Sequence, residues 1–136
     1  MIGGVEIEHD RGLAGHSDAD VLAHAVIDAL LGSCGLGDIG ELFPPDDEQW
    51  RDADSLDLLR VVIGRLPGRP MNVDATLICE RPRLGPHRAE MEAKLSQVLS
   101  APVNVKATTN EGMGAIGRGE GIACVAVAMV ETGEPA

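Results

Sequence analysis

The sequence predicts an α+β fold in which helices cover one face of a mixed four-stranded sheet. Apolar residues recur at helical spacing in three segments, 20–32, 54–66 and 86–99. Strand-like patterns fall before, between and after these segments, which indicates one sheet with interleaved helices. The chain has 136 residues and 44% hydrophobic content, so residues 1–136 suit a single compact domain.

The strand-like segments differ in character. Residues 2–7 are predicted to form a short strand or hairpin arm. Segments 72–80 and 103–108 alternate apolar with polar residues, as strands with unequal faces do. Segment 121–130 is continuously apolar and completes the predicted sheet.

The helices have recognisable beginnings. Ser17 can cap the first helix, with Asp20 three positions later as the acid of a capping box. Asp54 or Ser55 can cap the second helix, and Pro86 suits the first turn of the third.

The composition excludes several classes of function. Lys and Arg number 11 against 22 Asp and Glu, a formal net charge of -11, which repels nucleic acid because the cations are scattered. Phe43 and Trp50 are the only aromatic residues on which a base could stack. No apolar run is long enough to span a bilayer, and the odd number of cysteines suits reduced thiols. We expect a cytoplasmic protein without a nucleic-acid or membrane partner.

The last predicted strand is apolar on both faces, since Ile122, Cys124 and Ala126 alternate with Ala123 and Val125. A sheet with helices on one side would leave one of these faces exposed. Either another subunit covers it, so that the sheets of an oligomer face one another, or the strand is central and buried within the monomer.

His24 lies on the polar stripe of the first helix, because Asp20 and Asp28 stand four positions before and after it. Such an imidazole could bind a transition metal through one nitrogen while a carboxylate orients the other. The alternative is a solvated acidic helix face with an incidental histidine.

Other residues carry groups suited to phosphate. His16 and Ser17 lie at the start of the first helix, where backbone N–H groups and the helix dipole favour an anion. Segment 107–111 offers hydroxyls for phosphate oxygens and ends in Glu111, whose carboxylate suits a hard cation. Arg118 stands among glycines and can approach a diphosphate. The alternatives are a helix cap, a surface loop and ordinary strand-to-turn chemistry.

Five separated motifs together resemble one family. They are SDADVLAHAVIDA (17–29), LGDIGELFP (36–44), PRLGPH (82–87), NVKATT (104–109) and GRGEGIA (117–123). In this order they are similar to the 2-C-methyl-D-erythritol 2,4-cyclodiphosphate synthases. The resemblance covers nearly the whole chain, and several motifs in order are far more specific than one.

The resemblance implies a homotrimer with active sites between adjacent subunits. It also implies a phosphorus–oxygen lyase of the non-mevalonate route to isoprenoid precursors. The 2-phosphate of 4-diphosphocytidyl-2-C-methyl-D-erythritol 2-phosphate attacks the β-phosphorus of its own diphosphate, which closes the 2,4-cyclodiphosphate and releases CMP. The small-molecule substrate is thus a cytidine diphosphate derivative. The implied cofactors are Zn2+, or another divalent transition metal, and Mg2+ or Mn2+.

Particular residues acquire roles from the same resemblance. His24 would bind zinc and Glu111 magnesium. His16 and Thr109 would stabilise the transition state, and His16 with Ser17 would hold phosphate. The methylerythritol end would contact Asp38, Ile39, Gly40, Phe43, Pro44, Pro45, Asp46 and Asp47. The cytidine diphosphate end would contact Cys79, Glu80, Arg81, Pro82, Arg83, Leu84, Gly85, Thr108, Thr109, Asn110 and Glu111, and Arg118 would face substrate or a phosphate in the central channel.

The sequence departs from the family pattern at its start. Members usually begin with a strand whose Asp-x-His pair supplies two zinc ligands, and here His9 and Asp10 belong to a different loop. Either the start of the sequence was placed too far downstream, or the domain is N-terminally truncated or altered. As written it has one of the three protein ligands, too few for a stable catalytic zinc site. Arg83 also replaces the usual lysine, and Ala115 a residue that is often aromatic.

Two alternatives follow from this departure. The chain could be a catalytically impaired homologue, a trimer that binds a cytidine nucleotide or an isoprenoid diphosphate without turnover. It could also be a metal-binding protein of unrelated role, which would require tight zinc binding by His24.

Overall fold

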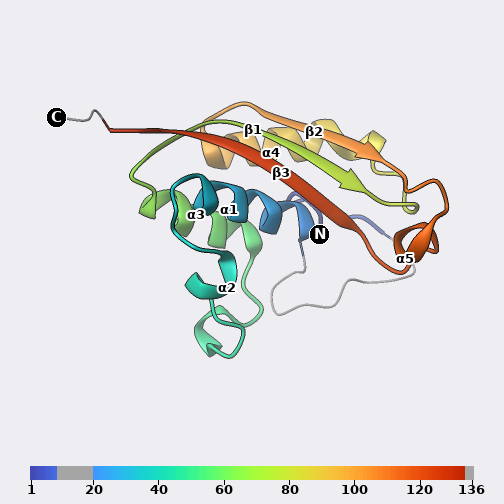
Figure 1. The fold of residues 1–136 in the computed structure, drawn as a ribbon, viewed down its shortest axis with the longest axis horizontal. Helices are drawn as coiled ribbons and strands as arrows, with labels where there is room; N and C mark the ends of the chain where they lie inside the picture. The colour runs from blue at the N-terminus through green and yellow to red at the C-terminus, as the bar shows by residue number, and fades with distance from the viewer. Residues whose placement is uncertain (9–19, 134–136) are drawn as a thin grey trace.

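The centre of the molecule is a mixed three-stranded sheet with the strand order β2–β1–β3. The computed structural model describes residues 1–8 and 20–133. β1 (Gly68–Ile78) pairs in parallel with β2 (Val103–Thr108) and antiparallel with β3 (Ala123–Thr132). The long β1 therefore lies between its two partners (Figure 1). The α+β class and the mixed sheet predicted from the sequence are confirmed.

The predicted fourth strand at residues 2–7 is absent from the described part of the sheet. Ile2 and Val5 form an isolated antiparallel bridge with each other. Gly3 and Gly4 between them have φ of +59° and +77°, a left-handed conformation that reverses the chain and that glycine adopts readily. The segment is therefore a tight turn and cannot extend along a neighbouring strand.

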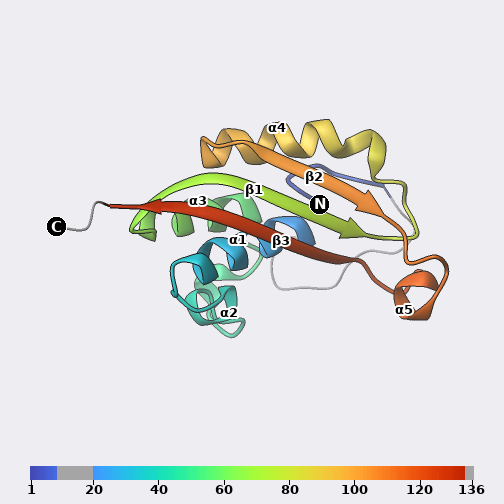
Figure 2. The same ribbon diagram turned by 45° about the horizontal axis from the view of Figure 1, so that its top comes forward.

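The helices lie on one side of the sheet (Figures 1 and 2). The long helix α1 packs against β3 and β1, α4 packs against β2, and α3 packs against α1 and α4. The helical elements are α1 (Val21–Ser33), α2 (Ile39–Leu42), η1 (Glu48–Trp50), α3 (Ser55–Arg65), η2 (Gly85–His87), α4 (Arg88–Leu99) and α5 (Gly114–Gly117). None of those among residues 1–8 and 20–133 has the length and apolar content needed to cross a bilayer.

The core lies between the sheet and the three long helices. Alternate residues of β1 point into it, with Val73, Ala75 and Leu77 buried, as the period of a strand requires. From α1, the large side chains that are fully buried are Leu22, Val26, Ile27, Leu30 and Leu31. Each side chain of this size contributes about 2 kcal/mol through its burial, so α1 is fixed firmly to the sheet.

β3 is an edge strand with one face uncovered. Val125, Val127 and Met129 are 61%, 67% and 64% exposed, while Ala126 and Ala128 between them pack against the core. The alternative of a central strand buried on both faces within the monomer is therefore wrong. The uncovered side chains form an apolar stripe, defined here as Val125, Val127 and Met129.

The outer face becomes polar away from β3. Asp74 of β1 accepts hydrogen bonds from Asn104 Nδ2 at 3.0 Å and from Lys106 Nζ at 2.9 Å, both on β2. These two donors hold the pKa of the Asp74 carboxyl below its usual value, the hydrogen bond from Asn104 having the larger effect. The apolar stripe is thus bordered by a charged, hydrogen-bonded surface.

A buried carboxylate joins the N-terminal turn to α1. Asp20 is 0% exposed, and it accepts hydrogen bonds from the N–H groups of Gly3, Gly4 and Ala23 at 2.7, 2.8 and 2.9 Å. The contact with Ala23 makes Asp20 itself the N-cap of α1. The prediction of Asp20 as a capping-box acid within the helix is wrong, and Ser17 lies outside the described residues.

Replacement of Asp20 tests this interaction. In Asp20→Asn one carboxylate oxygen becomes an NH2 group that faces backbone N–H donors, so we expect the free energy of unfolding to fall by about 3 kcal/mol. Urea unfolding at fixed protein concentration measures it. The exposed Asp57→Asn, which breaks an ion pair with Arg60 on the surface of α3, is the control and changes stability by less than about 1 kcal/mol. Equal effects of the two substitutions would contradict this account.

Candidate functional site

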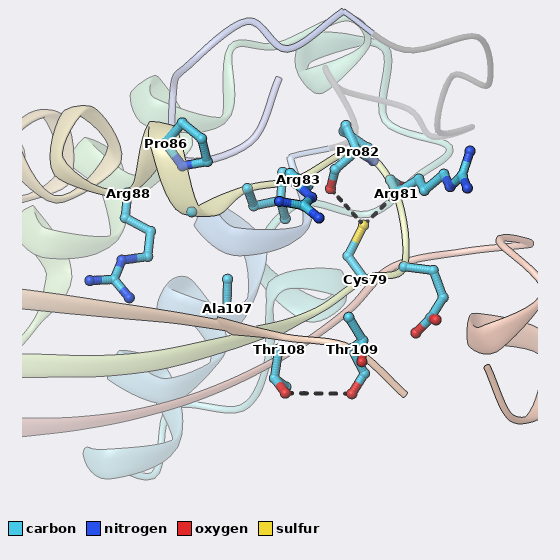
Figure 3. A pocket seen from close by; sticks show the side chains of 12 residues that line it. Cys79, Arg81, Pro82, Arg83, Pro86, Arg88, Ala107, Thr108 and Thr109 are labelled. Atoms are coloured by element: carbon cyan, nitrogen blue, oxygen red, sulfur yellow. Dashed lines mark hydrogen bonds between the residues drawn. The ribbon is translucent and has the colours of Figure 1, made fainter. Parts of the chain in front are cut away.

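A large cavity lies where β1 and β2 end. The last register pair of the two strands is Ile78 with Thr108, and the next residue, Cys79, donates its N–H to the Thr108 carbonyl at 2.9 Å. Because parallel strands end at the same edge of a sheet, the segments that follow them are adjacent. They enclose a cavity of about 850 Å³ lined by Cys79, Glu80, Arg81, Pro82, Arg83, Leu84, Gly85, Pro86, Arg88, Ala107, Thr108 and Thr109 (Figure 3).

This cavity, called the arginine cavity below, contains the whole of segment 79–85 together with Thr108 and Thr109. These are nine of the eleven residues that the family resemblance assigned to the cytidine diphosphate end; the other two, Asn110 and Glu111, do not line the cavity. Pro86, Arg88 and Ala107 also line it and were not predicted. The sequence could have indicated Arg88, because it lies in the first turn of the third predicted helix, which begins at Pro86 directly after the segment assigned to the ligand.

The arginine cavity is lined by three arginines, Arg81, Arg83 and Arg88, of which Arg81 points away from the other two (Figure 3). None of them takes part in the ion pairs found between described residues, in a chain whose net charge is -11. Arg88 is the first residue of α4, where the helix dipole disfavours a cation. Figure 3 shows Arg83 and Arg88 on the side of the 79–88 segment, with Thr108 and Thr109 on the other side. The arrangement suits an anion that hydroxyls can also reach.

Cys79 forms part of the cavity wall as a neutral thiol. Its Sγ donates to the Arg81 carbonyl at 2.9 Å, and the residue is 6% exposed. Burial raises the pKa of this thiol, the Arg81 contact opposes the rise, and the Glu80 carboxylate adds to it. The thiol therefore acts here as a hydrogen-bond donor that fixes the turn after β1.

A smaller cavity lies beside α1 and α2. It has a volume of about 190 Å³ and is lined by His24, Ile39, Gly40, Phe43, Pro44, Pro45, Trp50 and Leu58. Phe43 and Trp50 meet edge to face with ring centroids 4.7 Å apart. This apolar cavity, as we call it, gathers most of the residues predicted for the methylerythritol end. Trp50 and Leu58 were not predicted, because their approach depends on the fold of the 43–58 segment.

His24 stands at the wall of the apolar cavity and is held by another helix. Its Nε2 lies 2.9 Å from Oγ of Ser55, which is 0% exposed at the start of α3. Asp28, one turn further along α1, accepts the N–H of Ile39 at 2.9 Å and so anchors α2. Of the two acids of this stripe, Asp20 is buried, and Asp28 is exposed but hydrogen-bonded. One ring nitrogen of His24 is thus held by a serine hydroxyl, and the predicted carboxylate partner of the other nitrogen stays a prediction.

The remaining predicted residues lie outside both cavity linings. Asp38 and Asp47 cap α2 and η1 through hydrogen bonds to Glu41 N and Gln49 N, and Asp46 is exposed. Asn110 and Glu111 lie in the turn after β2. Arg118 forms an exposed ion pair with Glu120. His16 and Ser17 lie outside the described residues.

The described residues alone do not complete a metal site. Within residues 1–8 and 20–133, no three side chains of His, Cys, Asp or Glu come together as a ligand set. His24 would supply one imidazole beside a serine hydroxyl, whereas a catalytic zinc site needs three protein ligands. The Glu111 carboxylate lies on an exposed turn. No catalytic step is therefore derived through a metal ion.

Three comparisons with known proteins agree. The sequence model of the YgbB family matches residues 1–131. The 2-C-methyl-D-erythritol 2,4-cyclodiphosphate synthase of Salinibacter ruber is 54% identical over 97% of this chain and 88% of its own. The solved bifunctional IspDF from Campylobacter jejuni superposes with a TM-score of 0.88 at 40% identity, over 94% of this chain and 36% of that one. A solved 2C-methyl-D-erythritol-2,4-cyclodiphosphate synthase with CDP bound gives 0.86 at 33% identity, over 96% and 89%.

Fold and cavities define an α+β protein with a cationic cavity at the ends of two parallel strands and an apolar cavity beside its first helix. The chain belongs to the YgbB family, that of the 2-C-methyl-D-erythritol 2,4-cyclodiphosphate synthases. The family resemblance in the sequence motifs is thereby confirmed.

Alkylation tests the environment of Cys79. Because burial raises its pKa, less thiolate is present at a given pH, and we expect iodoacetamide at pH 7.5 to label Cys79 at least about tenfold more slowly than in the urea-unfolded chain. The labelling rate of Cys79 in the folded chain should keep rising above pH 9, whereas the labelling rate in the unfolded chain levels off there. Mass spectrometry of the Cys79 peptide measures both rates. Equal rates in folded and unfolded chain would show an accessible, ordinary thiol.

Proposed function

We propose that this protein cyclises 4-diphosphocytidyl-2-C-methyl-D-erythritol 2-phosphate to 2-C-methyl-D-erythritol 2,4-cyclodiphosphate with release of CMP. The observation that carries the proposal is the arginine cavity, because it gathers the segments assigned to the cytidine diphosphate in a member of the YgbB family. Relatives that bear the synthase name, and a synthase solved with CDP, support the same substrate class. The cytoplasmic location expected from the sequence belongs to this proposal.

The two ends of the substrate have separate places in this proposal. The arginine cavity would hold the cytidine diphosphate, with Arg83 and Arg88 near the phosphates and Thr108 and Thr109 as hydroxyl donors. The apolar cavity would hold the branched carbon chain, whose methyl group suits a wall made by Phe43 and other apolar side chains.

The two cavities have no lining residue in common, and this supports an active site between subunits. The arginine cavity lies where β1 ends, and the apolar cavity lies beside α2. Figure 1 shows the end of β1 and α2 at separate places in the fold. One chain would give its arginine cavity and a neighbour its apolar cavity. The apolar stripe on β3 would then be covered in a homotrimer, because sheets facing one another bury Val125, Val127 and Met129.

The chemistry asks the protein mainly to position and to neutralise charge. An oxygen of the substrate's 2-phosphate forms a bond to the β-phosphorus, the bond from that phosphorus to the bridging oxygen breaks, and CMP leaves with the electron pair. No protein nucleophile is needed. Guanidinium groups and hydroxyls that meet the transferred phosphoryl group stabilise the charge that develops on its oxygens.

Metal dependence is a further part of the proposal and comes from family membership alone. His24 would supply one zinc ligand and Glu111 a ligand for magnesium or manganese. Elemental analysis of the purified protein, before and after dialysis against a chelator, tests this part. Retention of about one zinc per chain would support it, and absence of bound zinc after loading would favour an impaired homologue that binds cytidine nucleotides without turnover.

Activity is the first prediction from this function. Phosphorus NMR of the purified chain with its substrate, zinc and magnesium should show the cyclic diphosphate and CMP appearing together. Thr109→Val removes a hydroxyl donor and should lower kcat by about 100-fold. Binding of CDP without any product, in a folded protein, would contradict the proposed reaction.

Assembly is the second prediction. Val127→Asp places a charge in the centre of the apolar stripe, where Val127 is 67% exposed in the single chain, so we expect the fold to persist and the trimer to dissociate. Light scattering after size exclusion measures the mass. Ala93→Asp, an added charge on the exposed side of α4, is the control and should leave the mass unchanged. A monomeric unmodified chain would contradict the trimer.

A further inference from the structure

Glu80 makes an interaction that differs from the substrate contact assigned to its segment. It is the second residue beyond β1, which ends at Ile78. Its Oε2 accepts the N–H of Asn110 at 2.5 Å, and its Oε1 accepts the N–H of Gly112 at 3.2 Å. Both carboxylate oxygens are thus bound to alternate backbone N–H groups of the turn that follows β2. A carboxylate held by two backbone donors is a strong, directional contact.

The turn that Glu80 holds carries the groups nearest to the proposed chemistry. Thr109 lies between the end of β2 and the first N–H bound by Glu80, and its Oγ1 accepts the N–H of Glu111 at 3.3 Å. Asn110 closes the turn, since its carbonyl accepts the N–H of Met113 and its Nδ2 donates to the Met113 carbonyl. Four consecutive N–H groups, from residues 110 to 113, are thereby bound within the protein.

The conformation of this turn needs such support. Glu111 has φ of +55° and Gly112 has φ of +74°, and the left-handed region is unfavourable for a residue with a Cβ such as Glu111. The bonds from Glu80 to the residues on either side of Glu111 hold it there. Without them the turn would relax toward conformations that point the Thr109 side chain elsewhere.

We propose that Glu80 is a positioning residue, whose carboxylate fixes the turn at 109–112 so that Thr109 meets the reacting phosphate. This inference rests on the proposed function. Glu80 then acts on the reaction through the turn, and the arginines and the other residues of the cavity bind the substrate. It also means that the N–H groups of Asn110 and Gly112 are bound by Glu80, so the phosphates are contacted by side chains.

Hydrogen exchange of the substrate-free protein tests the contact itself. In Glu80→Ala both acceptors are lost, and we expect the Asn110 and Gly112 amides to exchange at least about tenfold faster. In Glu80→Gln one oxygen remains and the other acceptor becomes an NH2 group, so one of the two amides should exchange faster. The matched control is Glu92→Gln, since Glu92 on α4 also accepts a strand N–H, that of Val105 at 2.8 Å. Unchanged exchange at both amides in Glu80→Ala would overturn the proposal.

Kinetics then separate positioning from substrate binding. If Glu80 orients Thr109, Glu80→Gln should lower kcat by about tenfold, with KM and the Kd of CMP within about threefold of those of the unchanged chain. Glu92→Gln should keep its kcat. A raised KM and Kd with unchanged kcat would make Glu80 a substrate ligand and overturn the proposal. Turnover by the unchanged chain tests the proposed function separately, because the exchange rates are measured without substrate.

Discussion

Parallel pairing of β1 with β2 is the constraint on which the larger cavity depends. Both strands end at one edge, and the hydrogen bond from Cys79 N to the Thr108 carbonyl extends their ladder beyond the last paired residues. Segments 79–88 and 107–113 are brought together for this reason. β1 is also bonded to β3 on its other side, so the end of β1 is fixed from both sides. The cavity is therefore built on a rigid part of the sheet.

The first helix shows how one face can serve three purposes. Asp20, the N-cap of α1, is followed at intervals of four residues by His24 and Asp28, yet each of the three contacts a different segment. Asp20 holds the N-terminal turn, His24 meets Ser55 at the start of α3, and Asp28 anchors α2 through Ile39. Because Leu22, Val26 and Leu30 fix the opposite side of α1 to the core, these polar contacts position the surrounding loops relative to the sheet.

How much of this was predictable depends on the range of the interaction. Periodicity located the three long helices and three of the four predicted strands, since these are local patterns. Segment 79–85 and Thr108 were assigned to one ligand by the family resemblance, and the parallel pairing of β1 with β2 explains why they are adjacent. The prediction of a strand at 2–7 was wrong because Gly3 and Gly4 turn the chain between the apolar residues Ile2 and Val5. Trp50 and Leu58 join the apolar cavity, and Ser55 meets His24, through contacts between distant segments that leave no periodic signal. Glu80 was predicted to touch substrate, whereas its carboxylate binds backbone groups of another loop.

The contrast between the acidic chain and its arginine cavity has a kinetic consequence. A net charge of -11 repels a polyanion as it approaches, whereas the guanidinium groups attract it only within about 10 Å, the Debye length in ordinary buffers. The net charge of the molecule thus lowers the association rate of a phosphorylated ligand, and the arginines of the cavity lower its dissociation rate. Added salt should speed association and dissociation alike. The equilibrium constant would then change little, although both rate constants depend strongly on ionic strength.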